Sequence, residues 1–419
     1  MEDSFSTIAQ RAKSASKKLA SISTGLKNLA LTNVMQNILE NKERIFNSNI
    51  EDLENAKILL EKGEINQSTY NRLKLDENKM RDMIQGIKDI ISLDDPIGKV
   101  LLKRELDENL VLTKKSCPIG VLGIIFEARP DVISQISSLA IKSSNAVILK
   151  GGKESINTNK TIMSVIQEGL DKTEGFPKNV LNQVFTRDDV AEMLKQDKYI
   201  DLIIPRGGNN LVKFIKENTK IPVLGHADGI CHIFVDEFAD IEKAKKIIID
   251  AKTQYPSACN SVETVLVHKN FVPQKELKTA LLDAGIGLIF EPDSWHKEYG
   301  EKKLSYKVVN SLEEAIEHIN EFSSGHTESI VTENEDNAKI FMNAVDSAGV
   351  YHNVSTRFAD GFRYGFGAEV GISTNKTHAR GPVGLEGLTI YKYTLEGSGQ
   401  IVKDYAEGIK QFHHKDIKN

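Results

Sequence analysis

One segment of the chain, Tyr255-Pro-Ser-Ala-Cys259-Asn-Ser-Val-Glu, carries the side chain best suited to covalent chemistry. A cysteine is a strong nucleophile that is partly ionised at neutral pH. The neighbours of Cys259 are small or polar and an apolar strand follows, so the thiol has room to react. A single cysteine is more often a small buried hydrophobic residue, and Cys117 and Cys231, in or beside apolar strands, fit that description better. Cys259 is therefore the candidate nucleophile among the three, and a small residue without a catalytic role remains the alternative.

Two apolar segments end in glycines and lead into helical patterns, at 146–153 and 200–210. In open parallel sheets, ligands bind beyond the carboxyl ends of the strands. Glycine lets backbone N–H groups approach phosphate oxygens, and a helix N-terminus favours their negative charge. Neither segment is a dinucleotide fingerprint or a phosphate loop, and a tight turn with a helix cap is the alternative. Because two such segments occur, we predict nucleotide binding by Lys150, Gly151, Gly152, Lys153, Arg206, Gly207 and Gly208.

The histidines do not predict a metal site. His226 and His232 flank Cys231, but no pair of residues has the spacing of a zinc motif such as H-E-x-x-H or C-x-x-C. No G-x-S-x-G nucleophile elbow is present either. The stretch 361–371, rich in glycine and aromatic residues, fits either the frame of a pocket or an irregular surface loop.

Alternating strands and helices must position these residues. The first hundred residues predict helices, and apolar residues from Ile8 to Leu29 recur at spacings of four and three, as in one amphipathic helix. Its basic outer face suits a solvated helix packed on a core better than a membrane-surface helix. Strands are expected at 109–115, 119–126, 146–150, 180–185 and 200–206, with helices at 131–144, 156–170 and 188–195. Short connections between them indicate a parallel sheet covered by helices on both faces.

The pattern restarts at Ile230 and gives a second α/β unit that runs to about residue 385. A late strand at 388–394 and a polar helix that closes the chain follow it. With 419 residues, 40% hydrophobic and 27% charged, the chain has the composition of a globular protein of two or three domains.

Composition excludes several classes of protein. The net charge of -5 argues against a nucleic-acid binder. Three scattered cysteines are no disulfide framework and indicate a reducing compartment. No apolar run reaches the length of a membrane span, and the N-terminus has no secretory pattern. These features predict a cytoplasmic enzyme.

Several long segments together resemble the aldehyde dehydrogenase superfamily: 117–132, 149–154, 204–208, 225–232, 255–264, 353–361 and 372–382. The resemblance implies an α/β fold with two parallel-sheet domains and a small β oligomerisation element. An NADP-binding domain would span 1–225, interrupted by a hairpin near 104–122, and a catalytic domain 226–386. Residues 387–419 would supply a strand that pairs with the hairpin and with a partner subunit, and a C-terminal helix. A homodimer or larger homo-oligomer follows, because an unpaired edge strand is a natural pairing site.

Within the superfamily, the chain is most similar to the branch that reduces L-glutamyl 5-phosphate with NADPH to glutamate 5-semialdehyde and phosphate, in proline biosynthesis. The resemblance implies that Cys259 forms a thioester and expels phosphate, and that the thioester is then reduced. Glutamate 5-kinase would supply this substrate. An acylating enzyme that uses coenzyme A, or an inactive nucleotide-binding protein, remains an alternative.

Departures from the superfamily pattern refine the expected site. Oxidising members carry a Glu that activates water where this chain has His226, and a reductase has no use for such a base. They also carry an Asn oxyanion donor where this chain has Ala128. The backbone N–H of Cys259, helped by Asn260, is therefore the expected oxyanion donor.

The positively charged residues indicate where the cofactor and the substrate would bind. Relatives that prefer NAD place a Glu where this chain has Lys153, and a cation suits the 2′-phosphate of NADPH. A solvent-exposed lysine without this role is the alternative. The anionic substrate needs cations, for which Arg129, Arg357 and Arg380 are the candidates, with His226 beside them.

Overall fold

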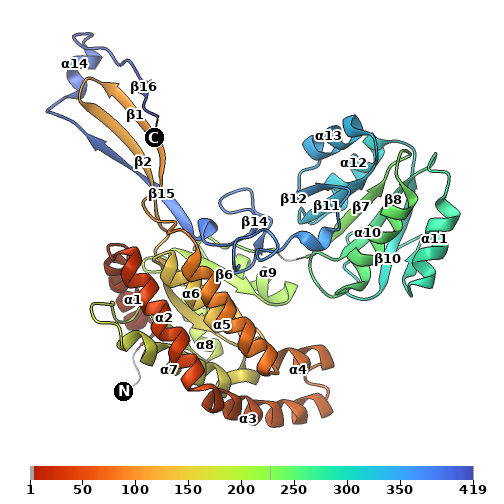
Figure 1. Cartoon of the computed structure of the whole chain (residues 1–419), viewed down its shortest axis with the longest axis horizontal. Coiled ribbons are helices and arrows are strands. Elements are labelled where there is room, and N and C mark those ends of the chain that lie inside the picture. The colour runs from red at the N-terminus through yellow and green to blue at the C-terminus, as the bar shows by residue number, and fades with distance from the viewer. Residues whose placement is uncertain (1–3, 227, 419) are drawn as a thin grey trace. The chain divides into compact units, whose positions relative to one another are not determined.

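The computed structural model describes residues 4–226 and 228–418, which divide into two units. The first unit comprises the chain up to Arg206, 218–223 and the chain from Gly384 onward. The second comprises 207–217 and 224–383. Figure 1 shows their elements in sequence colours. Residues 207–217 fall in the second unit and the C-terminal strand in the first, where the predicted ranges were 1–225, 226–386 and 387–419.

Five helices open the first unit: α1 (Phe5–Leu19), α2 (Thr24–Glu40), α3 (Lys42–Glu61), α4 (Gln67–Leu73) and α5 (Glu77–Ser92). The prediction of one helix through Leu29 was wrong. The side chain of Ser23 accepts a hydrogen bond from the N–H of Leu26 and so begins a second helix with a rotated buried face. Leu29 is consequently 51% exposed, whereas Lys27 is buried and forms an ion pair with Asp95.

A four-stranded parallel sheet forms the centre of the first unit, in the order β5-β4-β3-β6. Its strands are β3 (Val121–Phe126), β4 (Ala146–Lys150), β5 (Leu181–Val184) and β6 (Leu202–Arg206). The helices between them are α6 (Val132–Lys142), α7 (Ile156–Asp171), preceded by the 3-10 turn η1 (Lys153–Ser155), and α8 (Arg187–Met193). Every residue of β3 is buried, as its continuous apolar run predicted. The predicted strand and helix alternation is confirmed.

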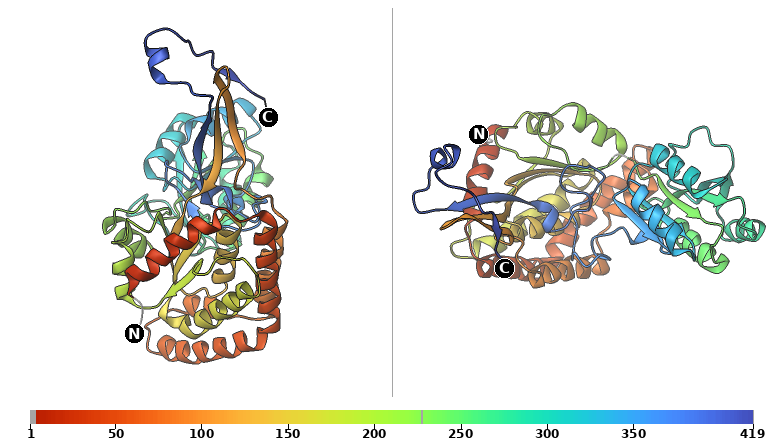
Figure 2. Two further views of the ribbon diagram at one scale, coloured as in Figure 1. Left: turned by 90° about the vertical axis from the view of Figure 1, so that its left-hand side faces the viewer. Right: turned by 90° about the horizontal axis from the view of Figure 1, so that it is seen from above.

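An antiparallel sheet completes the first unit. It has the order β15-β2-β1-β16, built from β1 (Val100–Asp107), β2 (Leu110–Pro118), β15 (Thr389–Glu396) and β16 (Lys415–Asp416). Figure 2 shows β15, in blue, beside the β1–β2 hairpin, in orange. The predicted pairing of the late strand with the hairpin is thus correct. The hairpin, predicted near 104–122, consists of β1 and β2, and the chain enters the parallel sheet at Val121. The closing helix is the short α14 (Val402–Ala406), which β16 follows.

The second unit is built on a six-stranded sheet in the order β12-β11-β7-β8-β10-β9, with every pair parallel. The strands are β7 (Cys231–Val235), β8 (Val262–His268), β9 (Gly287–Ile289), β10 (Lys303–Val309), β11 (Thr327–Val331) and β12 (Gly349–His352). The helices are α9 (Asn209–Glu217), α10 (Ile241–Thr253), α11 (Gln274–Asp283), α12 (Leu312–Phe322) and α13 (Glu335–Ala344).

Two hydrophobic clusters cover the two faces of this sheet. Along β7, Ile233 and Val235 belong to a cluster with α10 and α11. Phe234, on the opposite face, packs in a cluster with α12 and α13. This alternation follows from the period of two in a strand and makes both faces apolar.

Short elements follow the second sheet: the 3-10 turn η2 (Thr356–Phe358), the bridging pair β13 (Ile372–Ser373) and β14 (Gly381–Pro382), and the 3-10 turn η3 (Glu386–Leu388). Among the described residues, no helix is both long and apolar enough to cross a membrane.

Candidate active site

The parallel pairing of β11, β7 and β8 brings three segments to the amino edge of the second sheet. β7 lies between the other two strands, so the residues that precede each strand emerge at one edge. His326 precedes β11, the segment 225–230 precedes β7, and Cys259 lies in the loop that precedes β8. Residues far apart in the sequence therefore become neighbours.

Gly229 sits directly against the backbone of Cys259. A Cβ at Gly229 would lie 2.4 Å from the carbonyl oxygen of Cys259 and 2.5 Å from its Cα, which leaves room only for glycine. The N–H of Gly229 donates to Glu298 Oε2 at 3.2 Å, and the Cys231 thiol donates to the Cys259 carbonyl at 3.3 Å. Residues in β7 and in the segment before it thus hold the loop that carries Cys259.

The loop of Cys259 consists of two successive turns. The N–H of Ala258 donates to the carbonyl of Tyr255, and the N–H of Ser261 donates to the carbonyl of Ala258. The Cys259 side chain is partly exposed. Its own N–H has no hydrogen-bond partner among the described residues, so it is free to serve as the predicted oxyanion donor.

Asn260 ties this loop to the turn η2. Its Nδ2 donates to the carbonyl of Ala359 at 2.8 Å, and Thr356 Oγ1 donates to the carbonyl of Asn260 at 2.7 Å. The Asn260 side chain is buried, and its Oδ1 has no partner within the described chain. An amide held in this way positions the loop, in addition to the predicted help with the oxyanion.

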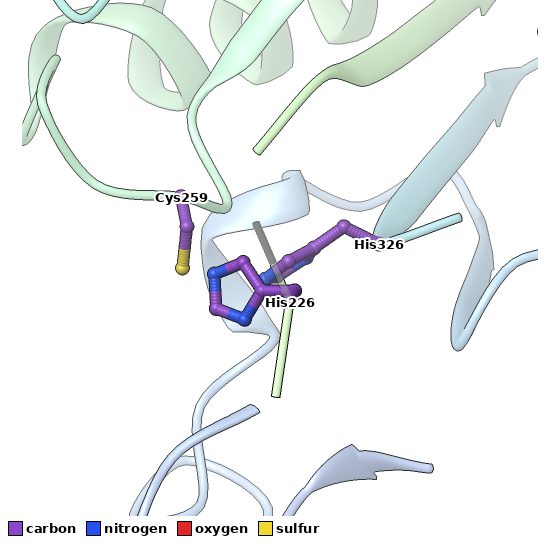
Figure 3. A group of neighbouring side chains, drawn as sticks. All are labelled: His226, Cys259 and His326. Atoms are coloured by element: carbon purple, nitrogen blue, oxygen red, sulfur yellow. The ribbon is translucent and has the colours of Figure 1, made fainter. Parts of the chain in front are cut away.

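Two histidines lie beside the Cys259 thiol. A ring nitrogen of His226, a ring nitrogen of His326 and the Cys259 sulfur all lie within 4.8 Å of one another. His226 Nδ1 lies 2.9 Å from the carbonyl oxygen of Ile372, and because a carbonyl only accepts, Nδ1 carries the proton. In the neutral form of the ring, Nε2 is then an acceptor, and Figure 3 shows the ring edge of His226 turned toward the sulfur.

His326 is the site residue that the sequence analysis missed. Its ring packs edge-on against that of His226, with centroids 5.0 Å apart. It stands alone before an apolar strand, and nothing in its local sequence distinguishes it from an ordinary buried histidine. Only its position at the start of β11 relates it to Cys259.

The three cysteines differ in their surroundings. Cys231 is fully buried, and this burial, reinforced by the negative charge of Glu328, raises the pKa of its thiol well above the usual value. Burial also raises the pKa of Cys117, which lies on β2 in the first unit. A thiol held in its neutral form is a poor nucleophile. These environments agree with the choice of Cys259 among the three.

The candidate arginines belong to different units, with Arg357 and Arg380 in the second and Arg129 in the first. Arg357 lies on η2, which contacts the Cys259 loop through Asn260, and its Nε donates to Gln254 Oε1 at 2.9 Å. Burial, followed by the charge of Arg363, lowers the pKa of Arg357. Arg380 is exposed and pairs with Asp346 at 2.9 Å. Arg129 belongs to the first unit, where it lies 3.5 Å from Asp131.

Five of the seven predicted cofactor residues, Lys150, Gly151, Gly152, Lys153 and Arg206, lie at the carboxyl edge of the first sheet. Lys150 ends β4 and Arg206 ends β6, on the two sides of β3. A Cβ at Gly151 would lie 2.3 Å from Asn159 Nδ2, so the turn into α7 requires glycine there. Lys153 is exposed at the start of η1. Gly207 and Gly208 belong to the second unit, and a Cβ at Gly208 would meet nothing within 4 Å.

Ala128 follows β3 at the same edge. Its backbone has a left-handed φ of 44°, and its N–H donates to Glu154 Oε1 at 2.8 Å. Its methyl group packs with Ala56 and Leu73. Ala128 thus offers no side-chain donor, as expected, and Glu154 is a further residue of this edge that the sequence analysis did not single out.

Comparison with known proteins identifies the family. The sequence model of the aldehyde dehydrogenase family matches residues 2–285. Proteins named gamma-glutamyl phosphate reductase from Brachyspira hyodysenteriae and Acetivibrio thermocellus are 59% and 52% identical, each over 98% of this chain and over 99% and 98% of their own lengths. The crystal structure of gamma-glutamyl phosphate reductase from Thermotoga maritima, 39% identical, superposes with a TM-score of 0.91 and covers 95% of this chain and 100% of that one.

The chain therefore belongs to the aldehyde dehydrogenase family of oxidoreductases, and within it to the family of the gamma-glutamyl phosphate reductases. This confirms the resemblance seen in the sequence and the predicted fold class. The aldehyde dehydrogenase family uses a nicotinamide cofactor, and its members at this level of similarity act on small molecules.

Substitution of Gly229 tests the role of the close backbone contact. Gly229→Ala must displace the Cys259 loop, because the added Cβ would meet backbone atoms that cannot rotate away. We expect the rate of alkylation of Cys259 by iodoacetamide to change by about tenfold, and the melting temperature to fall by several degrees. Peptide mass spectrometry and thermal unfolding measure these quantities.

Gly86→Ala on α5 is the matched control, since a Cβ at Gly86 meets nothing within 4 Å. It should leave the alkylation rate unchanged and slightly raise the melting temperature. If Gly229→Ala behaves like Gly86→Ala, the contact does not position Cys259.

Proposed function

We propose that the chain reduces L-glutamyl 5-phosphate to glutamate 5-semialdehyde and phosphate, with NADPH, through a thioester on Cys259. The observation that carries the proposal is the partly exposed Cys259 thiol beside the free Nε2 of His226, in a chain 59% identical to a protein named for this activity. Glutamate 5-kinase is the proposed supplier of the acyl phosphate. We place the reaction in the cytoplasm, where the thiol stays reduced.

In the first half-reaction, His226 Nε2 accepts the thiol proton and the Cys259 sulfur attacks the acyl carbon. A C–S bond forms, the bond from the acyl carbon to the phosphate oxygen breaks, and phosphate leaves with the bonding electron pair. The N–H of Cys259, which has no hydrogen-bond partner among the described residues, would hold the oxygen that becomes negative during the attack. Covalent catalysis thereby divides one difficult step into two easier ones.

In the second half-reaction the thioester is reduced. The chemistry that NADPH supplies when bound is a hydride for the thioester carbon. When the C–S bond then breaks, the sulfur takes the electron pair as a thiolate and the aldehyde is released. His226 returns its proton to solvent or to the thiolate, and the site is restored.

Arg357 is our candidate for an anion of the substrate. It lies on η2, which Asn260 and Thr356 fasten to the Cys259 loop. Its Nε is held by Gln254, so the guanidinium is oriented before substrate arrives. Arg380 is engaged with Asp346 and would have to exchange that partner for the substrate.

The carboxyl edge of the first sheet suits a dinucleotide phosphate. Gly151 permits a close turn there, and α7 begins just beyond it. Lys153 stands exposed at this turn, where its ammonium would meet the 2′-phosphate of NADPH. Lys150 and Arg206 would add positive charge from the neighbouring strand ends.

β15 is our candidate for an oligomer interface. It is an edge strand, because β2 is its only neighbour in the described sheet. Tyr393 and Leu395 on this strand are 58% and 57% exposed, which is unusual for an edge that faces water. We propose that a second copy of the chain pairs with this strand.

The reverse reaction tests the activity. With glutamate semialdehyde, phosphate and NADP, the wild-type chain should form NADPH, and Cys259→Ala should lose at least about 10³-fold in rate, since no other group can carry the acyl chain. Cys117→Ala, which removes another partly exposed thiol, should retain full activity. An inactive wild-type chain, or equal rates for Cys259→Ala and wild type, would contradict the proposal. If coenzyme A replaces phosphate with equal or higher efficiency, the acylating alternative is correct.

Lys153→Glu tests the cofactor assignment. The carboxylate would repel the 2′-phosphate and accept hydrogen bonds from the ribose of NAD, so the ratio of kcat/KM for NADP to that for NAD should fall by about tenfold or more, or about 1.4 kcal/mol. Lys178→Glu makes the same charge change at another exposed position of the first unit and should leave the ratio unaltered. An unaltered ratio in Lys153→Glu would rule the assignment out.

The oligomer is tested by the double substitution Tyr393→Lys and Leu395→Lys. Charges on an edge strand oppose pairing, so light scattering should show a dimer or larger species for the wild type and a monomer for the variant. Leu282→Lys, at an exposed leucine of α11, should keep the wild-type mass. A monomeric wild type at micromolar concentration, or an unchanged mass of the variant, would refute this interface.

A further inference from the structure

Three potential metal ligands lie together at the amino edge of the second sheet. One nitrogen from each of His226 and His326 and the sulfur of Cys259 all lie within 4.8 Å of one another (Figure 3). Each ligand precedes a different strand, so the spacing of the residues in the sequence could not reveal the cluster. The sequence analysis accordingly predicted no metal site.

Each of the two histidines makes a hydrogen bond at Nδ1, which leaves its other ring nitrogen for a ligand. His226 Nδ1 is bound to the carbonyl of Ile372 at 2.9 Å, and His326 Nδ1 lies 2.9 Å from Thr327 Oγ1. Metal-binding histidines are usually oriented in this way, by a hydrogen bond at the nitrogen that does not bind the metal. His326 is 1% exposed, and its Nε2 has no partner within the described chain. A buried nitrogen without a partner is costly unless a ligand satisfies it.

The donor set selects the kind of metal. One thiolate and two imidazoles favour Zn²⁺ over Mg²⁺ or Ca²⁺, which prefer oxygen. In a tetrahedral zinc site, the ligand atoms are about 3.3–3.7 Å apart. The present separations, none above 4.8 Å, must shorten to reach that range, and the partly exposed Cys259 lies on a loop rather than in a strand.

We propose that His226, Cys259 and His326 bind one Zn²⁺ ion, with water as the fourth ligand. Binding forms a Zn–S bond and releases the thiol proton to solvent, without any change of oxidation state. The bound sulfur can no longer attack an acyl carbon. If the proposed function holds, zinc is therefore a reversible inhibitor that competes with the acyl phosphate and protects the thiol from oxidation.

Direct titration tests the site without any substrate. The full chain, reduced and stripped of metal, is titrated with Zn²⁺ against a chromophoric chelator, and we expect one equivalent to bind. Cys259→Ser and His326→Gln should each weaken binding by at least about tenfold. Cys117→Ser and His413→Gln are the matched controls, because they remove a thiol and an imidazole elsewhere, and both should bind as the wild type does.

Two measurements on the wild-type chain avoid variants that fail to fold. Zn²⁺ should block alkylation of Cys259 by iodoacetamide and leave the slower alkylation of Cys117 unchanged, and Co²⁺ should give thiolate-to-cobalt charge-transfer absorption in the near ultraviolet. Full binding in Cys259→Ser, or unprotected Cys259 at saturating Zn²⁺, would overturn the proposal. Reversal of zinc inhibition by a chelator is then measured in the reductase assay. Zinc binding in an inactive chain would refute the proposed function and leave the metal site standing.

Discussion

The close approach of Gly229 to the backbone of Cys259 is the contact on which the candidate site depends. It joins the segment before β7 to the loop before β8, and only a residue without a Cβ permits it. The Cys231 thiol adds a hydrogen bond to the same carbonyl, which holds the Cys259 backbone against the sheet. With the backbone held on that side, the Cys259 side chain is left to face His226. A buried cysteine thus supports the orientation of the exposed one.

A buried ion pair anchors the two elements that flank the Cys259 loop. Lys252, at the end of α10, lies 2.8 Å from Glu263 on β8, and both side chains are fully buried. Burial raises the pKa of Glu263 and lowers that of Lys252, while their mutual attraction opposes both shifts. Such a pair contributes little net stability, because desolvation offsets the attraction. The two charged groups must nevertheless stay within hydrogen-bond distance of each other. The pair therefore fixes the separation between the end of α10 and β8, which the Cys259 loop must span.

The candidate groups lie at the carboxyl edge of the first sheet and at the amino edge of the second. In the first unit, Lys150 and Arg206 lie at carboxyl ends of strands, where helix N-termini and free N–H groups favour phosphate. In the second, Cys259 and the two histidines lie at amino ends of strands, where loops of irregular backbone converge. The proposed anion binding and the proposed covalent chemistry therefore draw on different features of the same α/β architecture.

Local pattern was sufficient for much of this structure. Continuous apolar runs predicted β3 and β4, and small polar neighbours singled out Cys259. Local pattern failed where a capping hydrogen bond restarted a helix at Ser23, and where β16 follows the short helix α14 and pairs with β1.

The sequence by itself determined the strand and helix alternation and the family, and it made Cys259 the candidate nucleophile, because each depends on residues that are neighbours along the chain. Only the tertiary structure decided that His326 joins Cys259 and His226, and that Gly229 must be glycine. Those relations depend on which strands lie side by side, and the order β11-β7-β8 is set by packing across the whole sheet, which no local pattern encodes.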